Sequence, residues 1–235
     1  MNDGRKRLFL VDDHPLVREW LSILINRQLD LTVCGQDENG PSALAAIAAS
    51  PPDLVIVDLN LNNSSGLELI KALKESHAGV PILVLSMHDE SQYAARAFRA
   101  GAHGYVNKRE TAQKVIEAIR RVLDGKLYLS EKAAEILASR GRRGQAVGRS
   151  AIELLSDREL EVFERLGLGT STRQIADELQ VSVKTVQAYC ARIKEKIQVT
   201  SATELLREAV RWYDAKDADE KRVGSRLTDS GDASR

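Results

Sequence analysis

The first half of the chain alternates short apolar runs with amphipathic segments. Nearly continuous apolar runs lie at residues 7–11, 31–35, 54–58, 81–86 and 104–106. Continuous runs of this kind are typical of strands in a parallel sheet that is covered on both faces. The segments between them have helical spacing, at residues 16–28, 41–49, 67–75, 92–100 and 111–123. Repeated alternation of strand and helix predicts one doubly wound α/β domain.

The pattern changes after residue 126. Residues 140–150 are rich in Gly, Arg and Ser and have no hydrophobic period, so we expect residues 127–151 to form a basic linker that is partly helical and flexible. Residues 152–213 carry helical patterns with short polar breaks and no strand signal, which predicts a small all-α domain. Residues 214–235 are charged and contain few large apolar residues, and we expect a disordered tail there.

The composition fits a globular protein of two domains. The chain has 235 residues, of which 43% are hydrophobic and 29% charged, enough to bury a core in each domain. The 34 basic residues balance the 34 acidic ones, so the net charge is zero. A contact with a polyanion such as DNA must therefore come from a local patch of charge.

Several protein classes are disfavoured by simple counts. No apolar run approaches the ~20 residues that span a bilayer, so we expect no membrane segment. The N-terminus is polar and basic, and the apolar run that follows is too short for a signal peptide. Cys34 and Cys190 are too few for a disulfide framework and form no CxxC pair. These observations favour a cytoplasmic protein.

Polar residues follow four of the predicted strands. Asp12 and Asp13 come after the first strand, Asp58 ends the third, Ser86 ends the fourth and Lys108 follows the fifth. In a doubly wound sheet such strand ends meet at the point where the strand order reverses, so these residues should share one pocket. Crowded carboxylates call for a divalent cation, and Mg²⁺ prefers oxygen ligands. With a lysine and a hydroxyl beside them, the set predicts transient phosphorylation of an aspartate.

Each of these residues also has an ordinary structural explanation. An aspartate after a strand often forms a turn or caps a helix. A single serine or lysine would carry little information, and only the joint occurrence favours a site. The first β–α turn contains neither GxGxxG nor a Walker sequence, which disfavours a dinucleotide or P-loop site.

Four segments of the first half resemble the receiver domain of two-component response regulators. They are residues 9–15 (FLVDDHP), 54–68 (LVIVDLNLNNSSGLE), 84–87 (VLSM) and 101–108 (GAHGYVNK). The resemblance covers about residues 6–126. It implies that Asp58 is the phosphoacceptor. It also implies Mg²⁺ binding by Asp13, Asp58 and the backbone carbonyl of Asn60, with Asp12 acting largely through water.

The same resemblance assigns the residues that would report phosphorylation. Ser86 and Tyr105 occupy switch positions, and Lys108 occupies the phosphate-pairing position. A phosphoryl group adds roughly two negative charges. Ser86 would move toward it and Tyr105 would swing inward, which would reshape the surface of the fourth helix, fifth strand and fifth helix. Tyr105 could equally be an ordinary half-buried aromatic residue of a strand.

Two positions depart from the receiver pattern. Met87 stands where the family usually has a small residue, and we expect its side chain to restrict access to the pocket. Leu61 and Asn62 stand where Met-Pro is common, and we expect a looser loop there. The spacing from Asp58 to Gly66 is retained.

The second half contains three helix starts. Ser156 with Glu159 forms a capping box, Ser171 or Thr172 caps a short helix, and Ser182 caps a long helix over residues 183–197. A short helix, a tight turn and a longer helix form the helix-turn-helix pattern. That pattern alone also fits an ordinary amphipathic surface helix.

The long helix separates two kinds of residue. Its expected core positions are Val186, Cys190, Ile193 and Ile197, which recur at steps of three and four. The other side carries small and polar residues that could enter a major groove, where Gln can pair with adenine and Ala can contact a thymine methyl.

Residues 155–161, 175–179, 181–186, 193–199 and 203–209 resemble the LuxR-type DNA-binding domain, over about residues 152–212. Together with the receiver, this identifies the chain as similar to the NarL/FixJ class of response regulators. The resemblance implies base contacts from Gln187, Ala188 and Ala191. It implies backbone contacts from Lys184, Thr185, Arg192 and Lys196. It also makes the last helix a dimer surface, whose apolar residues could equally be core: Leu205, Leu206, Ala209 and Val210.

The sequence thus predicts a transcription regulator that is switched by phosphorylation rather than a conventional enzyme. The expected partners are a sensor histidine kinase, double-stranded DNA with paired half-sites, a second copy of the chain, and RNA polymerase. A HAD-like phosphatase or another Mg²⁺-dependent hydrolase is an alternative, although the chain has Asn60 where an Asp-x-Asp motif needs its second aspartate. A receiver-like protein that acts only through partner proteins is a third, and the helix-turn-helix argues against it.

Overall fold

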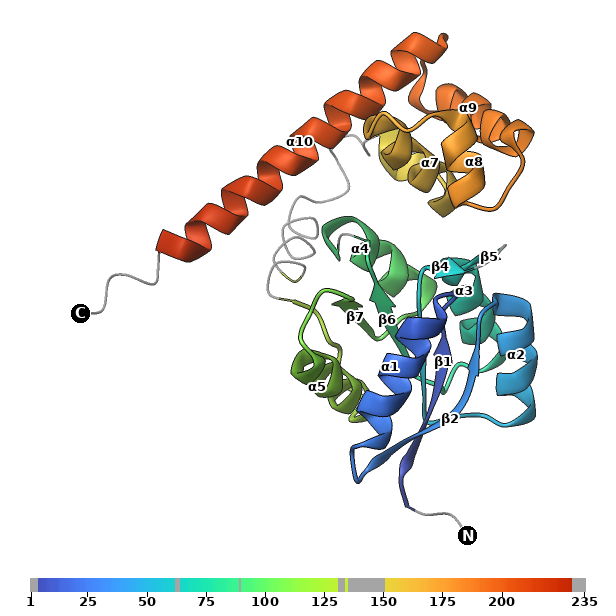
Figure 1. The fold of residues 1–235 in the computed structure, drawn as a ribbon, viewed down its shortest axis with the longest axis vertical. Coiled ribbons are helices and arrows are strands. Elements are labelled where there is room, and N and C mark those ends of the chain that lie inside the picture. The colour runs from blue at the N-terminus through green and yellow to red at the C-terminus, as the bar shows by residue number, and fades with distance from the viewer. Residues whose placement is uncertain (1–3, 62–63, 89, 131–133, 135–150, 230–235) are drawn as a thin grey trace. The chain divides into compact units, whose positions relative to one another are not determined.

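The protein forms two compact units, residues 1–147 and 148–235. The structure is a computed structural model that describes residues 4–61, 64–88, 90–130, 134 and 151–229 (Figure 1). Most of the predicted linker at 127–151 therefore lies outside the described residues.

The first unit is built on a parallel sheet of five strands. Their order is β2-β1-β3-β6-β7, and the bounds are β1 Lys6–Val11, β2 Leu31–Asp37, β3 Leu54–Val57, β6 Ile82–Ser86 and β7 Gly104–Asn107. β1 is therefore flanked by β2 and β3, so the chain reverses its direction of progress across the sheet. The expected doubly wound α/β fold is confirmed.

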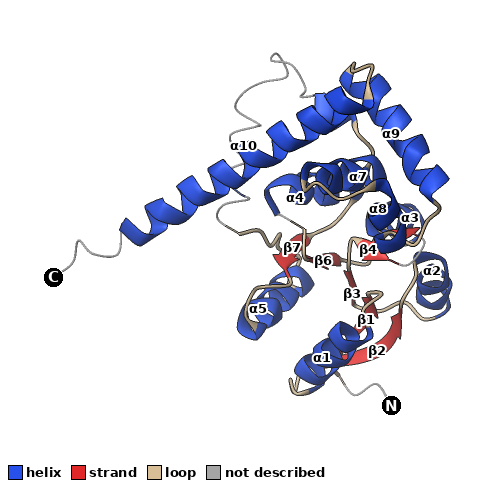
Figure 2. Cartoon of the chain, turned by 45° about the horizontal axis from the view of Figure 1, so that its top comes forward, coloured by secondary structure: helices blue, strands red, loops and turns tan. Residues whose placement is uncertain are grey.

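Helices cover both faces of this sheet. They are α1 Pro15–Asn26, α2 Gly40–Ala49, α3 Gly66–Ser76, α4 Glu90–Ala100 and α5 Ala112–Leu123. α1 and α5 lie on one face, and α2, α3 and α4 on the other (Figure 2). Leu21 and Ile25 of α1 and Ile119 of α5 pack on the sheet residues Leu10 and Ile56 in one buried cluster. Since strands with apolar side chains on both faces need cover on both, the continuous apolar runs follow from this arrangement.

A short antiparallel hairpin follows β3. It pairs β4, Asn60–Leu61, with β5, Ser64–Ser65, just before α3 begins. The hairpin places Asn60 two residues beyond Asp58, on the way from the sheet to α3.

The second unit contains helices and no strand among the residues that the structure describes. It contains a 3₁₀ turn η1, Ala151–Leu154, and the helices α7 Asp157–Gly167, α8 Thr172–Glu178, α9 Val183–Ile197 and α10 Ala202–Asp229. The predicted capping box at Ser156 with Glu159 is present, and Ser171 with Gln174 forms a second one. Gln180 adopts a positive φ of 51° in the turn between α8 and α9. The predicted helix-turn-helix is therefore formed.

The last helix is longer than the sequence suggested. We expected irregular chain from residue 214, and α10 instead continues to Asp229. The segment is rich in Ala, Lys, Glu, Asp and Arg, and Ala, Lys, Glu and Arg have high helix propensity even without an apolar face. The scarcity of large apolar residues therefore does not end a helix here. Within the described residues, no helix is both long and apolar enough to cross a bilayer.

Candidate functional sites

The carboxyl ends of neighbouring strands bring the predicted acidic residues and Lys108 together. Asp12 follows β1, Asp58 follows β3, and Lys108 follows β7. The Nζ atom of Lys108 lies 2.6 Å from Oδ2 of Asp12 and 2.6 Å from Oδ2 of Asp58. Because the side chains of all three are nearly or fully buried, this is a shared ion pair inside the protein rather than a surface contact.

Backbone hydrogen bonds between neighbouring strand ends fix these positions. The N–H of Asp58 donates to the carbonyl of Val11 at 2.8 Å, and the N–H of Lys108 donates to the carbonyl of Ser86 at 2.9 Å. Asp12 also forms the turn expected of an aspartate after a strand, since its Oδ1 accepts the N–H of His14 at 2.9 Å where α1 begins. It therefore helps to start α1 and contributes to the site as well.

Gly66 is required by the close return of the chain to Asp58. Its N–H donates to the carbonyl of Leu59 at 2.9 Å. A Cβ at Gly66 would overlap the carbonyl oxygen of Asp58 and lie 2.7 Å from Cα of Leu59. Only glycine lets α3 begin this close to the end of β3.

The site carries more negative charge than its single lysine balances. Burial raises the pKa of Asp58; Lys108 opposes this and the carboxylate of Asp12 adds to it. Burial also raises the pKa of Asp13, where His14 opposes and Asp58 adds to the effect. Burial alone would lower the pKa of Lys108, but Asp58 and Asp12 together raise it, so the ammonium form is held. A further cation would relieve the remaining repulsion.

The donor set fits such a cation. One ligand atom each from Asp12, Asp13, His14 and Asp58 lies within 4.8 Å of the others. Oδ1 of Asp58 is buried and accepts no hydrogen bond from any described residue, which leaves it available as a ligand. Carboxylate oxygens are ligands that Mg²⁺ prefers. The sequence did not single out His14, whose Nδ1 lies 2.6 Å from Oδ1 of Asp13; its place directly after two aspartates was the available signal.

Both expected switch residues are fully buried. Ser86 ends β6, and the N–H of His88 lies 3.4 Å from its hydroxyl. Tyr105 has 0% exposure, so it is not half-buried, and its hydroxyl donates to the backbone carbonyl of His88 at 3.0 Å. Asn107 donates to the same carbonyl at 3.1 Å. The inward position that we expected Tyr105 to reach is the one that the structure has.

The loop after β6 adds a residue that the sequence reasoning missed. The ring of His88 stacks on Tyr93 with centroids 4.3 Å apart, and its Nε2 lies 3.1 Å from Oδ1 of Asn60. His88 thus connects the loop after β6 to the hairpin after Asp58. Met87 beside it is exposed. No sequence pattern pointed to His88, because the contact depends on two loops meeting in space.

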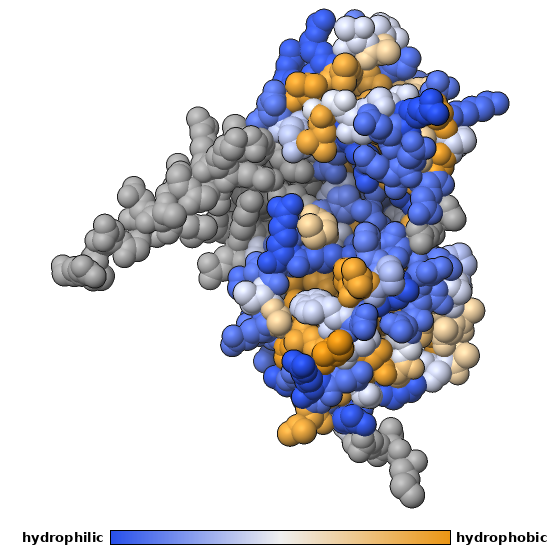
Figure 3. All heavy atoms as spheres, in the orientation of Figure 1, coloured by the Kyte–Doolittle hydropathy of each residue, from blue (hydrophilic) through white to orange (hydrophobic). Residues whose placement is uncertain are grey.

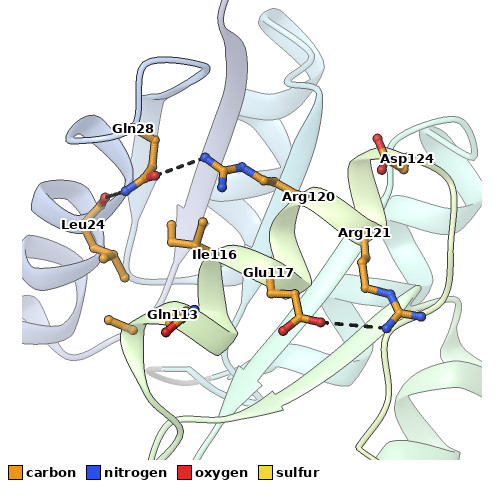
Figure 4. Close-up of a pocket in the computed structure, with 9 residues that line it drawn as sticks. Leu24, Gln28, Gln113, Ile116, Glu117, Arg120, Arg121 and Asp124 are labelled. Atoms are coloured by element: carbon orange, nitrogen blue, oxygen red, sulfur yellow. Dashed lines mark hydrogen bonds and ion pairs between the residues drawn. The ribbon is translucent and has the colours of Figure 1, made fainter.

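A groove of about 470 Å³ lies elsewhere, between α1 and α5 (Figure 4). Leu24 and Ile116 form part of its wall, and Arg120 donates to Asp30 and to Gln28 at its edge. None of its lining residues belongs to the acidic site. Over the face of the first unit shown in Figure 3, hydrophobic side chains reach the surface among hydrophilic ones.

In the second unit, α9 presents the predicted polar face to solvent. Five of the seven predicted DNA-contacting residues are exposed, namely Lys184, Gln187, Ala188, Ala191 and Arg192. Thr185 is half-buried, and its N–H donates to the capping hydroxyl of Ser182 at 3.0 Å. On the inner side Val186 and Ile193 are buried, whereas Cys190 and Ile197 are half-buried. The guanidinium of Arg192 lies 5.9 Å from the ring centroid of Tyr189.

Lys196 differs from the other predicted DNA-contacting residues. Its Nζ donates to Oε2 of Glu159 at 2.6 Å, and the side chain of Glu159 is only 3% exposed. The same carboxylate oxygen accepts the N–H of Ser156 at 2.7 Å, at the start of α7. Burial alone would raise the pKa of Glu159, but the hydrogen bonds from Lys196 and Ser156 lower it overall. The ammonium of Lys196 therefore already has an ion-pair partner, Glu159, within the second unit.

α10 separates the four apolar residues expected at a dimer surface. Leu205 and Ala209 are buried within the second unit and belong to its core. Leu206 and Val210 are 43% and 37% exposed and lie four residues apart, on one side of the helix. Because buried residues cannot contact a second copy, only Leu206 and Val210 remain as candidates for that surface.

Comparison with known families agrees with both units. Residues 8–120 match the family described as "Response regulator receiver domain", and residues 153–209 match "Bacterial regulatory proteins, luxR family". Both matches fall within the predicted domains.

Proteins of known type match nearly the whole chain. The transcriptional activator protein ExaE of Pseudomonas putida is 37% identical over 203 residues, covering 86% of this chain and 95% of its own. The oxygen regulatory protein NreC of Staphylococcus carnosus is 32% identical over 210 residues, covering 87% and 97%.

A solved structure shows the same likeness. The crystal structure of a two-component response regulator of the LuxR family from Aurantimonas sp. SI85-9A1 matches with a TM-score of 0.55 and 33% identity, over 59% of this chain and 99% of that one. The chain therefore belongs to the NarL/FixJ-type two-component response regulators, transcription regulators that join a receiver domain to a LuxR-type DNA-binding helix-turn-helix.

Proposed function

We propose that phosphorylation of Asp58 by a sensor histidine kinase in the cytoplasm controls how this protein binds promoter DNA. The observation that carries the proposal is the shared ion pair at the sheet edge. Lys108 holds two buried carboxylates at 2.6 Å, and one of them, Asp58, has a second oxygen that accepts no hydrogen bond from the described part of the chain. The arrangement offers both a nucleophile and a cation placed to receive an anionic group.

In the proposed transfer, an oxygen of Asp58 attacks the phosphorus of a phosphohistidine on the kinase. The bond between phosphorus and the histidine nitrogen breaks, its electron pair returns to the imidazole, and an acyl phosphate forms on Asp58. Mg²⁺ held by Asp13, Asp58 and the carbonyl of Asn60, with Asp12 acting through water, would supply positive charge to the transferring group. Lys108 then pairs with the phosphoryl oxygens.

The signal would leave the site through the loop after β6. Ser86 lies at its start, and the carbonyl of His88 within it accepts the Tyr105 hydroxyl. Movement of Ser86 toward a phosphoryl oxygen would vacate space for the ring of Tyr105, and the hydrogen bond from the Tyr105 hydroxyl to the His88 carbonyl would hold the loop in that arrangement. Met87, which is exposed, would affect the approach of water or a small donor from outside.

On the output side, α9 would enter the major groove. Gln187, Ala188 and Ala191 would face base edges, while Lys184, Thr185 and Arg192 would contact the backbone. Two copies would bind paired half-sites, and the exposed apolar pair Leu206 and Val210 is the part of α10 available to join them. A regulator bound in this way at a promoter would also meet RNA polymerase.

Phosphorylation can be tested with a small phosphodonor. Incubation with acetyl phosphate and Mg²⁺ should add one phosphoryl group that survives acid and is lost in base, as an acyl phosphate is. Asp58→Asn should abolish the adduct, and removal of Mg²⁺ by chelation should suppress it. Steady turnover of phosphorylated metabolites without a lasting adduct would instead favour the hydrolase considered above.

A further inference from the structure

His14, the residue just before α1, brings a ring nitrogen to the acidic site. Its Nδ1 lies 2.6 Å from Oδ1 of Asp13 and 3.3 Å from Oδ1 of Asp12. Its backbone N–H donates to the same Oδ1 of Asp12 at 2.9 Å. The backbone and the ring of one residue thus both contact the carboxylates that follow β1.

His14 occupies the N-cap position of α1 without capping the helix. Ser, Thr, Asp and Asn are preferred at this position, because their side chains accept a backbone N–H of the first turn. The side chain of His14 makes no such hydrogen bond, and Pro15 follows it as the first residue of the helix. Helix formation therefore does not account for the use of the imidazole, which contacts the carboxylates instead.

The donor atoms have the spacing of neighbouring ligands around a small cation. With bonds of about 2.0–2.1 Å, two ligands at right angles lie about 2.9 Å apart. The distances from Nδ1 of His14 to the two carboxylate oxygens, 2.6 and 3.3 Å, lie on either side of that value. Oδ1 of Asp13 and Oδ1 of Asp58 are buried and accept no hydrogen bond from any described residue. A cation among these atoms would therefore have a nitrogen as well as oxygens within reach.

A nitrogen ligand changes which cations the site binds well. Mg²⁺ takes oxygen ligands and keeps several waters, so an imidazole adds little to its binding. Imidazole is a better ligand for several divalent first-row transition metals, and the affinity of a site of nitrogen and oxygen ligands rises from Mn²⁺ through Co²⁺ to Cu²⁺. The side chain of His14 is largely exposed, so an ion can reach it from solvent.

We infer that His14 is a further ligand of the metal site at Asp58 and that it strengthens the preference of this site for a divalent first-row transition metal over Mg²⁺. This inference rests on the proposed function, because it assigns one more residue and a class of ion to the same site. Either kind of ion would supply positive charge to the transferring phosphoryl group. His14 would therefore affect which ion accompanies phosphorylation of Asp58.

Metal titrations of the full chain test the inference, with Co²⁺ as the transition-metal probe. Calorimetry in one buffer gives the Kd for Co²⁺ and for Mg²⁺, and displacement by excess Mg²⁺ identifies the Co²⁺ that is bound at the acidic site. His14→Ala should raise the Kd for Co²⁺ at least about tenfold, since removing even a residue that only orients a ligand costs that much. The Kd for Mg²⁺ should stay within about twofold. Equal changes for both ions, or an unchanged Kd for Co²⁺, would overturn the inference.

Two further variants separate metal binding from folding. Asn is a favourable N-cap residue and offers an oxygen in place of the nitrogen, so His14→Asn should fold like wild type, retain Mg²⁺ and still bind Co²⁺ more weakly. His77→Ala is the matched control. It also removes a histidine at a helix end, after α3, where Nδ1 lies 2.8 Å from the hydroxyl of Ser76. It should leave both Kd values unchanged. Wild-type affinity for Co²⁺ in His14→Asn would contradict ligation by the imidazole.

The visible absorption of bound Co²⁺ gives a second readout that does not depend on affinity. A nitrogen ligand shifts the Co²⁺ bands relative to a site with oxygen ligands alone. At saturating Co²⁺, the spectrum of His77→Ala should match wild type and that of His14→Ala should differ from it. Identical spectra in all three, in protein that binds Mg²⁺, would overturn the inference and leave the proposed function intact. Wild-type protein that binds neither ion would contradict the metal site of the proposed function and the inference with it.

Discussion

Lys108 and Lys196 each bring an ammonium group to 2.6 Å from a buried carboxylate. The two residues were predicted from the sequence to meet phosphate, one on Asp58 and one on DNA. The structure distinguishes them by their surroundings. Lys108 lies beside two carboxylates and can neutralise only one of their charges. A phosphoryl group that binds together with a metal cation can therefore still pair with the Lys108 ammonium. Lys196 balances one carboxylate, Glu159, that also caps a helix, so moving Lys196 to DNA would leave a buried charge unpaired.

Because Lys196 is paired within the second unit, we predict that it behaves differently from Lys184, an exposed lysine of the same helix. Lys184→Met should lower the magnitude of the salt dependence of DNA binding, log Kd against log [salt], by about 0.9, the value for one phosphate contact. Lys196→Met should leave that slope unchanged and instead reduce the free energy of unfolding by about 1–3 kcal/mol, because Glu159 loses its partner. Salt titrations of DNA binding and urea unfolding of both variants provide the measurements. A reduced slope in Lys196→Met with unchanged stability would show that Lys196 contacts phosphate directly.

Glu159 gives a pH dependence whose sign follows from its lowered pKa. Because the folded state holds the carboxylate ionised, its contribution to stability is present above the unfolded pKa of about 4.3 and disappears as pH falls through the lower folded value. Glu159→Gln should therefore cost about 1 kcal/mol at pH 7 and progressively less below pH 4. Urea unfolding over this pH range measures the difference. A gap between the two proteins that stays constant with pH would contradict the role given to the charge.

Asp58 should show the reverse sign. Its pKa is raised by burial and by Asp12, so the folded protein binds the proton more tightly than the unfolded chain does. Stability should then fall as pH rises from the unfolded pKa through the folded one. In the presence of a chelator, Asp58→Asn should be more stable than wild type at pH 7, on the order of 1 kcal/mol, and should lose that advantage in acid. An Asn variant that is less stable at pH 7 would mean that pairing with Lys108 outweighs burial.

At the scale of elements, the loop from β3 to α3 determines the geometry around Asp58. The chain turns back so closely that a Cβ at Gly66 would overlap the backbone of Asp58. The hairpin that contains Asn60 and the contact from His88 extend the same structure.

Gly66→Ala should therefore damage the site and not merely stiffen the loop. The added methyl would meet backbone rather than a flexible side chain, so α3 or Asp58 must move. We expect a loss of about 1–3 kcal/mol in stability and at least a tenfold slower reaction with acetyl phosphate. Gly79→Ala is the control, because nothing lies within 4 Å of the position of its Cβ. Normal phosphorylation kinetics in Gly66→Ala would contradict this view of the loop.

Most elements could be predicted because their signals are local. Continuous apolar runs predicted all five parallel strands. Ser156, Ser171 or Thr172, and Ser182 were the predicted caps of the helices that the structure shows as α7, α8 and α9, and Ser171 is the cap of α8. The features that escaped prediction depend on contacts between distant segments. His88 with Asn60, Lys196 with Glu159 and Tyr128 with Gly104 join residues that no spacing rule connects. The helical residues 214–229 escaped for another reason, since their helix propensity is not accompanied by an apolar face.

At the scale of the whole molecule, the net charge of zero is the sum of local regions whose charges differ in sign. The acidic site needs a cation, while the exposed face of α9 carries Lys184 and Arg192. Two exposed cations on a recognition helix give only a modest affinity for DNA, so a single copy should bind weakly. In the proposed function, joining two copies supplies the rest through effective concentration. Control of DNA binding by the receiver would then act on how two DNA-binding units are presented together.

The most direct test measures DNA affinity before and after phosphorylation. Genomic fragments retained by the full chain would first be selected in the presence of Mg²⁺ and acetyl phosphate. The Kd for a retained fragment would then be compared, with and without acetyl phosphate, for wild type and for Asp58→Asn. We predict at least a tenfold difference between the two conditions for wild type and none for Asp58→Asn. Equal affinity in both conditions, in wild-type protein shown by mass to carry the phosphoryl group, would contradict the claim that Asp58 controls DNA binding.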